Sequence, residues 1–207
     1  KLHTNLFLDL FLSKYRKPRL MTLLSESNSE TIFYLDLAAV LDNLSTYRSI
    51  LPKEHKIMAM IKANAYGLGA IIVANLLEKN NINYFGVAYA SEGEELRLAG
   101  IKSPIMVMNP GEMSFDKMLA QNLEPQIYSW GSLEKYISVL ADHSKFIPKG
   151  RIHIKIDTGM SRLGFKISDA DLLIKKLNQS PSMTVISLMS HLASAESPKE
   201  DSFTKKQ

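Results

Sequence analysis

Hydrophobic residues along this chain alternate between short continuous runs and stretches with helical spacing. Short apolar runs predict buried strands, and apolar positions three or four residues apart predict amphipathic helices. The predicted strands are TIFYLDL at 31–37 and six further runs at 56–62, 84–88, 104–109, 125–129, 151–157 and 184–190. The predicted helices cover 40–51, 69–79, 91–100, 113–121, 133–140 and 169–179, and SFTKKQ at 202–207 opens another.

This regular alternation, with short connections, predicts an α/β fold with a parallel sheet. Both a doubly wound sheet and a (β/α)8 barrel begin in this way, and periodicity does not separate them. Four polar residues, Lys62, Asn109, Asp157 and His191, fall at the C-terminal ends of predicted strands. Both architectures build their sites at those ends. Six strands fall short of a closed eight-stranded barrel, so a barrel would be incomplete here.

Helix 91–100 carries local signals at both of its ends. Ser91 followed by Glu94 predicts a capping box at its start, and Gly100 predicts its end.

Composition bounds the class of protein. The chain has 207 residues, of which 45% are hydrophobic and 22% are charged, as expected for one large domain with a substantial core. The net charge is +4, but basic and acidic residues are interleaved, so we expect no nucleic-acid partner. The basic cluster at 14–19 is expected to be a solvated terminal segment.

Absent residue types and patterns narrow the class further. Without cysteine, disulfides and thiolate metal sites are excluded, and we expect no metal. No apolar run approaches the roughly 20 residues of a membrane span, so we expect no membrane partner. Residues 1–30 are expected to be an N-terminal extension, in which Met21 could be a start.

The stretch KANAYGLG at 62–69 places a lysine at the end of an apolar strand. A partly desolvated lysine there could act as a nucleophile or base, including toward pyridoxal 5'-phosphate (PLP). The turn at 66–69 could present amides to an anion, with Tyr66 adding a hydrogen bond. Taken singly, however, strand-end lysines usually keep their amine in water, and Arg162 and His191 are unremarkable alone.

Several segments together identify a resemblance. KANAYGLG resembles the PLP-lysine motif KANAYGHG of the alanine racemases, and HIKIDTGMSRLGF at 153–165 resembles that family's KIDTGMGRLGF. MSHLASAES at 189–197 is similar to its THFATADE. Two more segments, TIFYLDLAAVLDNL and FGVAYASEGEELRLAGIKSPIMVM, resemble its opening and its second and third barrel strands. The resemblance spans roughly residues 31–207.

The resemblance implies a PLP-binding (β/α)8 barrel followed by a second β-domain, in a cytoplasmic homodimer. Such enzymes interconvert L-alanine and D-alanine and so supply peptidoglycan precursors. For this chain it implies an incomplete barrel of about six βα units at 31–207, with the β-domain missing.

The resemblance also implies roles for individual residues. Lys62 would hold PLP and act as one of two bases on the substrate Cα, and Tyr66 would bind the cofactor phosphate. Arg162 would bind the phenolic oxygen of PLP and the substrate carboxylate, a task that suits its planar fork. His191 would lie against the cofactor ring. Lys155 matches a lysine that is often carbamylated and orients the arginine.

This sequence also departs from the family pattern. Leu68 replaces a histidine and Ser161 replaces a glycine, whereas Met160 matches the family motif and is expected near the substrate. The second base, a tyrosine of the C-terminal domain, is not among these residues. We therefore expect the chain alone not to racemise alanine, and to be poorly stable because an open barrel exposes strand edges.

Three alternative functions stay open. One is a broad-specificity amino-acid racemase of the same fold, and another is a non-catalytic PLP-binding remnant. A third is a PLP-carrier protein, against which the Arg162 segment counts.

Overall fold

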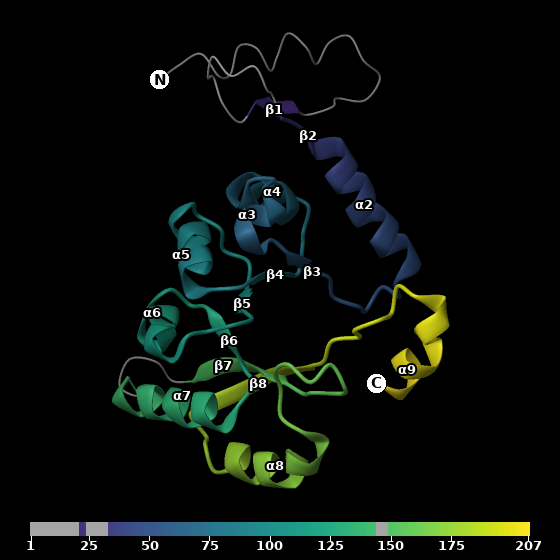
Figure 1. The fold of residues 1–207 in the computed structure, drawn as a ribbon. Helices are drawn as coiled ribbons and strands as arrows, with labels where there is room; N and C mark the ends of the chain where they lie inside the picture. The colour runs from purple at the N-terminus through teal and green to yellow at the C-terminus, as the bar shows by residue number, and fades with distance from the viewer. Residues whose placement is uncertain (1–20, 24–32, 144–148) are drawn as a thin grey trace.

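The computed structural model describes residues 21–23, 33–143 and 149–207 (Figure 1). The basic cluster at 14–19, and most of the expected extension at 1–30, therefore lie outside the described residues. The extension contributes strand β1 (Met21–Leu23), which pairs antiparallel with β2 (Tyr34–Asp36). The domain boundary near residue 30 stays a prediction.

The centre of the fold is a six-stranded parallel sheet whose spatial order follows the chain, β3-β4-β5-β6-β7-β8. A doubly wound sheet reverses its strand order at a switch point, whereas a barrel does not. The uninterrupted order therefore favours the barrel, and the six strands predicted after the first one, at 31–37, are confirmed. Their bounds are β3 (Met58–Met60), β4 (Tyr84–Val87), β5 (Ile105–Val107), β6 (Glu124–Ile127), β7 (Gly150–Lys155) and β8 (Met183–Met189).

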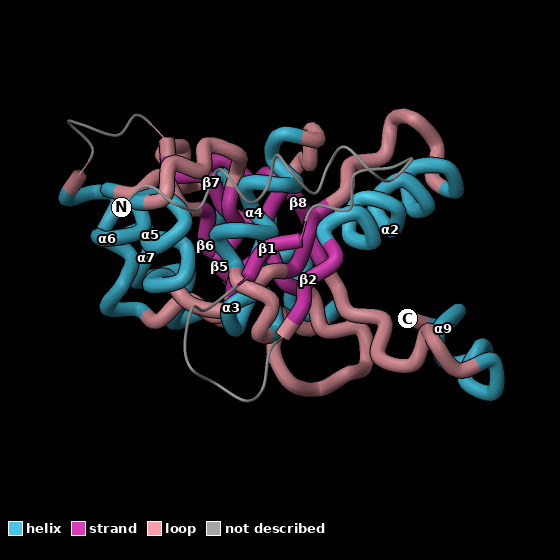
Figure 2. Tube along the Cα trace, turned by 90° about the horizontal axis from the view of Figure 1, so that it is seen from above, coloured by secondary structure: helices cyan, strands magenta, loops and turns pink. Residues whose placement is uncertain are grey.

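Helices follow the strands and lie around the outside of the sheet (Figures 1 and 2). The predicted helices are all present, with bounds shifted by a few residues. They are α2 (Leu37–Ile50), α4 (Ala70–Lys79), α5 (Ala90–Leu98), α6 (Phe115–Ala120), α7 (Trp130–Asp142), α8 (Ala170–Asn178) and α9 (Asp201–Lys206). Short 3-10 turns, η1 (Glu112–Ser114), η2 (Ile167–Asp169) and η3 (Pro198–Glu200), precede α6, α8 and α9. The short helix α3 (Lys62–Tyr66) was not predicted.

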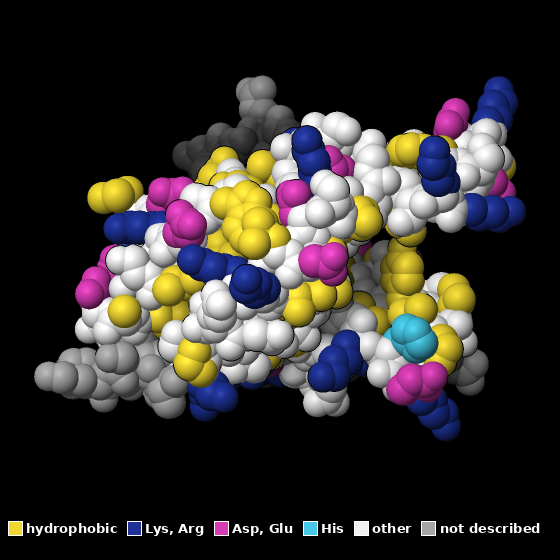
Figure 3. Space-filling view, turned by 90° about the horizontal axis from the view of Figure 1, so that it is seen from below, with side chains coloured by type: hydrophobic (Ala, Val, Ile, Leu, Met, Phe, Trp, Pro, Cys, Tyr) yellow, Lys and Arg dark blue, Asp and Glu magenta, His cyan; other side chains and the backbone are white. Residues whose placement is uncertain are grey.

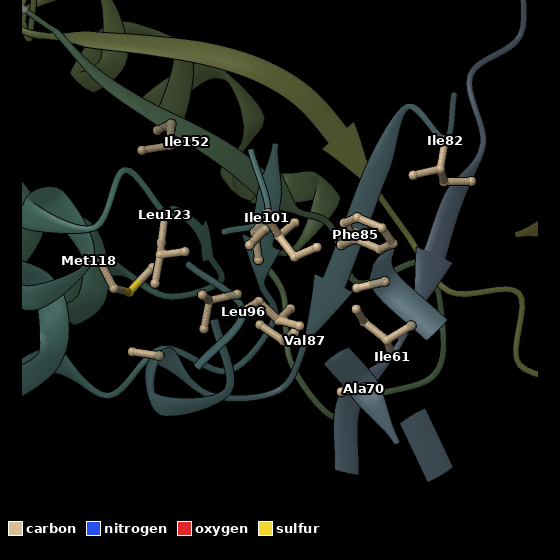
Figure 4. Close-up of a cluster of buried hydrophobic side chains, with 14 of the residues drawn as sticks. Ile61, Ala70, Ile82, Phe85, Val87, Leu96, Ile101, Met118, Leu123 and Ile152 are labelled. Carbon is tan, nitrogen blue, oxygen red and sulfur yellow. The ribbon is translucent and has the colours of Figure 1, made fainter. Parts of the chain in front are cut away.

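The apolar core lies between the sheet and these helices, and buried residues of both contribute to it. Every residue of β5 and β6 is buried. Figure 4 shows Phe85 and Val87 of β4 in one cluster with Leu96 of α5. Ile61, which directly precedes Lys62, belongs to the same core. The backbone on the N-terminal side of Lys62 is therefore anchored by apolar packing.

A network of polar side chains interrupts the apolar interior across four strands. The buried carboxylate of Glu124 on β6 accepts hydrogen bonds from Tyr84 (2.8 Å), His153 (2.8 Å) and Arg151 (2.5 Å). The other ring nitrogen of His153 lies 2.8 Å from Ser187 Oγ on β8. Buried polar groups must be satisfied in this way, since an unpaired one is costly. The strand patterns of the sequence did not indicate this network.

Candidate active site

Four polar residues follow the C-terminal ends of parallel strands, as predicted. Lys62, Asn109, Asp157 and His191 each come two residues after the last residue of β3, β5, β7 and β8. Because all the strands are parallel, these four positions belong to the same edge of the sheet. This is the edge at which barrel enzymes gather their catalytic groups.

Lys62 begins a turn with unusual backbone geometry. The next four residues, Ala63 to Tyr66, all have left-handed conformations, with φ between 51° and 56°. Each non-glycine residue in this region costs about 1–2 kcal/mol. Backbone strain of this kind clusters at functional sites, where the surrounding structure has to hold it. The strand therefore ends at Met60, and the lysine leaves the sheet through a left-handed turn.

The amides of this turn are occupied by the turn itself. Gly67 N–H donates to Ala63 O, Leu68 N–H to Ala65 O, and Gly69 N–H to Asn64 O, at 3.0–3.1 Å. Ala70 N–H donates to the side-chain oxygen of Asn64 at 2.7 Å. Three of these four amides belong to the 66–69 turn, and all four are hydrogen-bonded within the chain. Binding of an anion by the amides of this turn stays a prediction. Tyr66 remains available, because its side chain is 65% exposed.

Glu92 is a residue that the sequence reasoning missed. Its Oε2 accepts from the backbone N–H groups of Ala88 (2.6 Å) and Tyr89 (3.0 Å), and its Oε1 accepts from Ala63 N–H (2.6 Å). The predicted capping box of Ser91 and Glu94 is wrong, because α5 begins at Ala90 and Glu92 serves its first turn. The helix start was misplaced because serine is a common N-cap residue, whereas tyrosine, the N-cap in the structure at Tyr89, is an uncommon one.

Arg162 is carried by a loop that closes on itself. Asp157 N–H donates to Phe165 O and Phe165 N–H donates to Lys155 O, both at 2.9 Å. Inside the loop, Asp157 Oδ1 accepts from Gly159 N–H and Ser161 N–H at 2.9 Å, which lowers the pKa of the Asp157 carboxyl. This part of the DTGMSRLG motif is thus a structural turn that presents Arg162, whose side chain is exposed.

Lys155 is the last residue of β7 and is only 8% exposed. Burial, together with the nearby charge of Arg162, lowers the pKa of its ammonium group, although Asp157 acts in the opposite direction. A lowered pKa makes the neutral, nucleophilic amine more accessible. The charges of Lys155 and Arg162 therefore interact, whereas the orienting role of Lys155 and its carbamylation both stay predictions.

His191 lies in an exposed loop that is tied to its surroundings by backbone contacts. The carbonyl oxygen of His191 accepts from Gln207 Nε2 at 3.2 Å. The preceding residue, Ser190, has its hydroxyl 2.5 Å from Thr158 Oγ1, which joins the loop after β8 to the loop after β7. Arg162 and His191 are thus carried by loops that contact each other.

The structure does not join every predicted site residue directly. Among the described residues, Lys62 Nζ has no hydrogen-bond or ion-pair partner, so it forms neither interaction with Arg162 or His191. Within the described ranges, no group of three or more His, Cys, Asp or Glu side chains could hold a metal ion. Across the same part of the chain, no helix has both the length and the apolar character to cross a membrane.

The fold and this arrangement define a barrel-type α/β protein whose candidate site is built around a strand-end lysine. The sequence profile "Alanine racemase, N-terminal domain" matches residues 35–207. The chain belongs to the alanine racemase family, which is a family of isomerases.

Individual relatives agree with this assignment. The chain is 34% identical over 184 residues to an alanine racemase of Citrifermentans bemidjiense, covering 86% of this chain and 47% of that protein. It is 35% identical over 164 residues to one of Helicobacter pylori, covering 78% and 43%. The solved alanine racemase of Clostridium difficile superimposes with a TM-score of 0.76 at 31% identity, covering 82% of this chain and 44% of that one. The chain therefore spans a little under half the length of these relatives.

Proposed function

We propose that this chain forms the PLP-binding half-site of an alanine racemase, with Lys62 as the residue that carries the cofactor. One observation supports this most directly. Lys62 lies at the strained exit of β3, with its amine free of protein partners among the described residues. A strand-end lysine with a purely structural role would not need to be followed by four left-handed residues.

The residues present fit this cofactor. The side chains of Tyr66, Arg162 and His191 are exposed near strand ends, and thus available to a ligand. Tyr66 would donate a hydrogen bond to the cofactor phosphate, and Arg162 would pair with the phenolic oxygen. His191 would lie against the ring. PLP, when bound, supplies the electron sink that stabilises negative charge at the substrate Cα.

The chain's own groups would then handle the substrate and its proton. The free amine of Lys62 would take or return the Cα proton on one face. Arg162 would hold the carboxylate of alanine, because a guanidinium fork matches a carboxylate and stays charged. Met160, partly buried in the same loop, would lie near the substrate. A racemase needs a second proton donor on the opposite face, which we assign to no residue of this chain.

Lys155 would regulate the position of Arg162 through its own charge. As an ammonium it repels the guanidinium, and this repulsion contributes to the lowered pKa of Lys155. Reaction of the neutral amine with carbon dioxide would give a carbamate and a proton. The repulsion would thereby become an attraction that fixes Arg162.

The wider role is proposed from the family to which the chain belongs. We propose alanine as the substrate, a homodimer as the working assembly, the cytoplasm as the compartment, and peptidoglycan precursor supply as the purpose. On the face shown in Figure 3, Lys and Arg side chains are interspersed with Asp and Glu. This mixed charge suits a small-molecule substrate better than a polyanion.

The experiment is to incubate the purified chain with PLP, reduce it with borohydride, digest it, and locate the pyridoxyl group by mass spectrometry. We expect the label to concentrate on Lys62, and Lys62→Ala to abolish that peak. Label spread evenly over surface lysines would contradict the proposal. Measuring D-alanine formed from L-alanine in the same sample tests whether these 207 residues suffice for the complete reaction.

A further inference from the structure

Glu92 makes more contacts than helix capping requires. A carboxylate in the first turn of a helix normally serves the free amides and the dipole of its own helix. The contacts of Oε2 with Ala88 and Tyr89 fit that role. Oε1 instead accepts from Ala63 N–H, 29 residues earlier in the chain, at 2.6 Å. One side chain thus joins the start of α5 to the residue next to Lys62.

This contact reaches the strained segment from outside. The hydrogen bonds within the turn, such as Ala65 N–H to Ile61 O, are local. Within the described part of the chain, Glu92 is the one side chain of another βα unit that bonds to residues 62–67. Local bonds shape a turn but do not fix its direction relative to the sheet, whereas a bond to the neighbouring unit does.

We propose that Glu92 is a positioning residue for Lys62. By holding Ala63 N–H, its carboxylate fixes the peptide plane that immediately follows the lysine, and so the direction in which the lysine leaves β3. The inference rests on the proposed function insofar as Lys62 carries the cofactor. Its structural half, that Glu92 holds the turn, stands without the cofactor.

Glu92→Gln tests the contact with little change in size. The single carbonyl oxygen of glutamine can accept either from the α5 amides or from Ala63 N–H. The NH2 group then faces the other N–H donor and cannot accept a hydrogen bond from it. Glu95→Gln is the matched control, because Glu95 is exposed on the same helix. Amide hydrogen exchange over 62–69, measured without PLP, reports on the turn. Borohydride labelling after PLP addition reports on Lys62.

We expect exchange over 62–69 to become about tenfold faster in Glu92→Gln, because a charge-assisted bond is lost. We also expect the share of pyridoxyl label on Lys62 to fall about tenfold, since small misplacements reduce reactivity strongly. Both readouts should stay at parent values in Glu95→Gln.

The outcomes separate the alternatives. If exchange accelerates only over 88–98, Glu92 merely caps α5 and the inference is overturned. If exchange accelerates at 62–69 while even the parent chain places no label on Lys62, the turn is held as described but the proposed function fails. If Glu92→Gln unfolds the protein, Glu92→Asp is the second variant. It keeps the negative charge at the start of α5, but its side chain is one methylene shorter and should lose the bond to Ala63 N–H. Unchanged exchange at 62–69 in that variant would also overturn the inference.

Discussion

Replacing Glu124 by glutamine should destabilise the protein through the polar network inside the sheet. Glu124 is 4% exposed, and its two oxygens accept from three side chains. Glutamine has nearly the same shape, so no cavity forms, and the change isolates charge and hydrogen bonding.

The magnitude follows from the three partners. With its NH2 group turned toward Arg151, the glutamine oxygen can still accept from Tyr84 and His153. Those two hydrogen bonds then have a neutral acceptor instead of a charged one, which lowers the contribution of each to stability by about 1 kcal/mol. Arg151 is 47% exposed and can turn to water, so losing it costs at most about 1 kcal/mol. The total is about 2–3 kcal/mol, a substantial part of the 5–15 kcal/mol typical of a folded domain.

Urea unfolding followed by circular dichroism measures this difference. With a slope of about 2 kcal/mol per molar urea, the midpoint should fall by about 1 M. Glu134→Gln is the control, because Glu134 is exposed and its 4.0 Å pair with Lys176 is weak. An unchanged midpoint in Glu124→Gln would refute the reasoning.

The pH dependence gives a second check on Glu124. Burial alone would raise the pKa of the Glu124 carboxyl, but the bonds from His153, Arg151 and Tyr84 outweigh burial and lower it below 4.5. A lowered folded-state pKa contributes stability that is present above 4.5 and is lost as the pH falls through the folded value. The parent protein should therefore lose stability below about pH 4.5 more steeply than Glu124→Gln.

Two further predictions concern the loop that carries Arg162. Gly164 has φ +133°, and a Cβ there would lie 2.5 Å from Asp157 N, so Gly164→Ala should lower the unfolding free energy by about 2 kcal/mol or more. Gly111→Ala, at an open position with φ −72°, should leave it nearly unchanged in the same urea titration. Lys155→Met removes a buried amine whose pKa is lowered from 10.5, mainly by burial and to a smaller extent by the charge of Arg162. Because the unfolded chain binds that proton more tightly, the parent should gain stability as the pH rises toward 10.5, and the variant should lack this gain. Parallel stability profiles between pH 7 and 10.5 would contradict the assignment.

The elements of the fold were predictable because their signals are local. Apolar runs and helical spacing placed all six parallel strands and the helices after them, and the strand-end positions of Lys62, Asp157 and His191 followed directly. The left-handed turn after Lys62 was not predictable, because alanine and tyrosine rarely adopt that conformation. Hydrogen bonds within the turn and the contact from Glu92 hold it in this conformation.

The polar contacts of the site and of the sheet were equally unpredictable from the sequence. Glu92 sits in a helical pattern where a surface glutamate is ordinary, and its bond to Ala63 spans 29 residues. Glu124 and His153 occupy strands whose neighbours are apolar, so their pairing depends on strand register, which the pattern alone does not specify.

The strand order also bears on how the protein is made. From β4 onward, each strand of the parallel sheet pairs with the strand synthesised just before it, so its docking surface is already present when it leaves the ribosome. Glu92 follows Lys62 by only 30 residues, whereas Arg162 and His191 come 100 and 129 residues later. The lysine turn can therefore be locked early during translation. The groups that are proposed to complete the cofactor site are then added to a lysine whose orientation is already fixed.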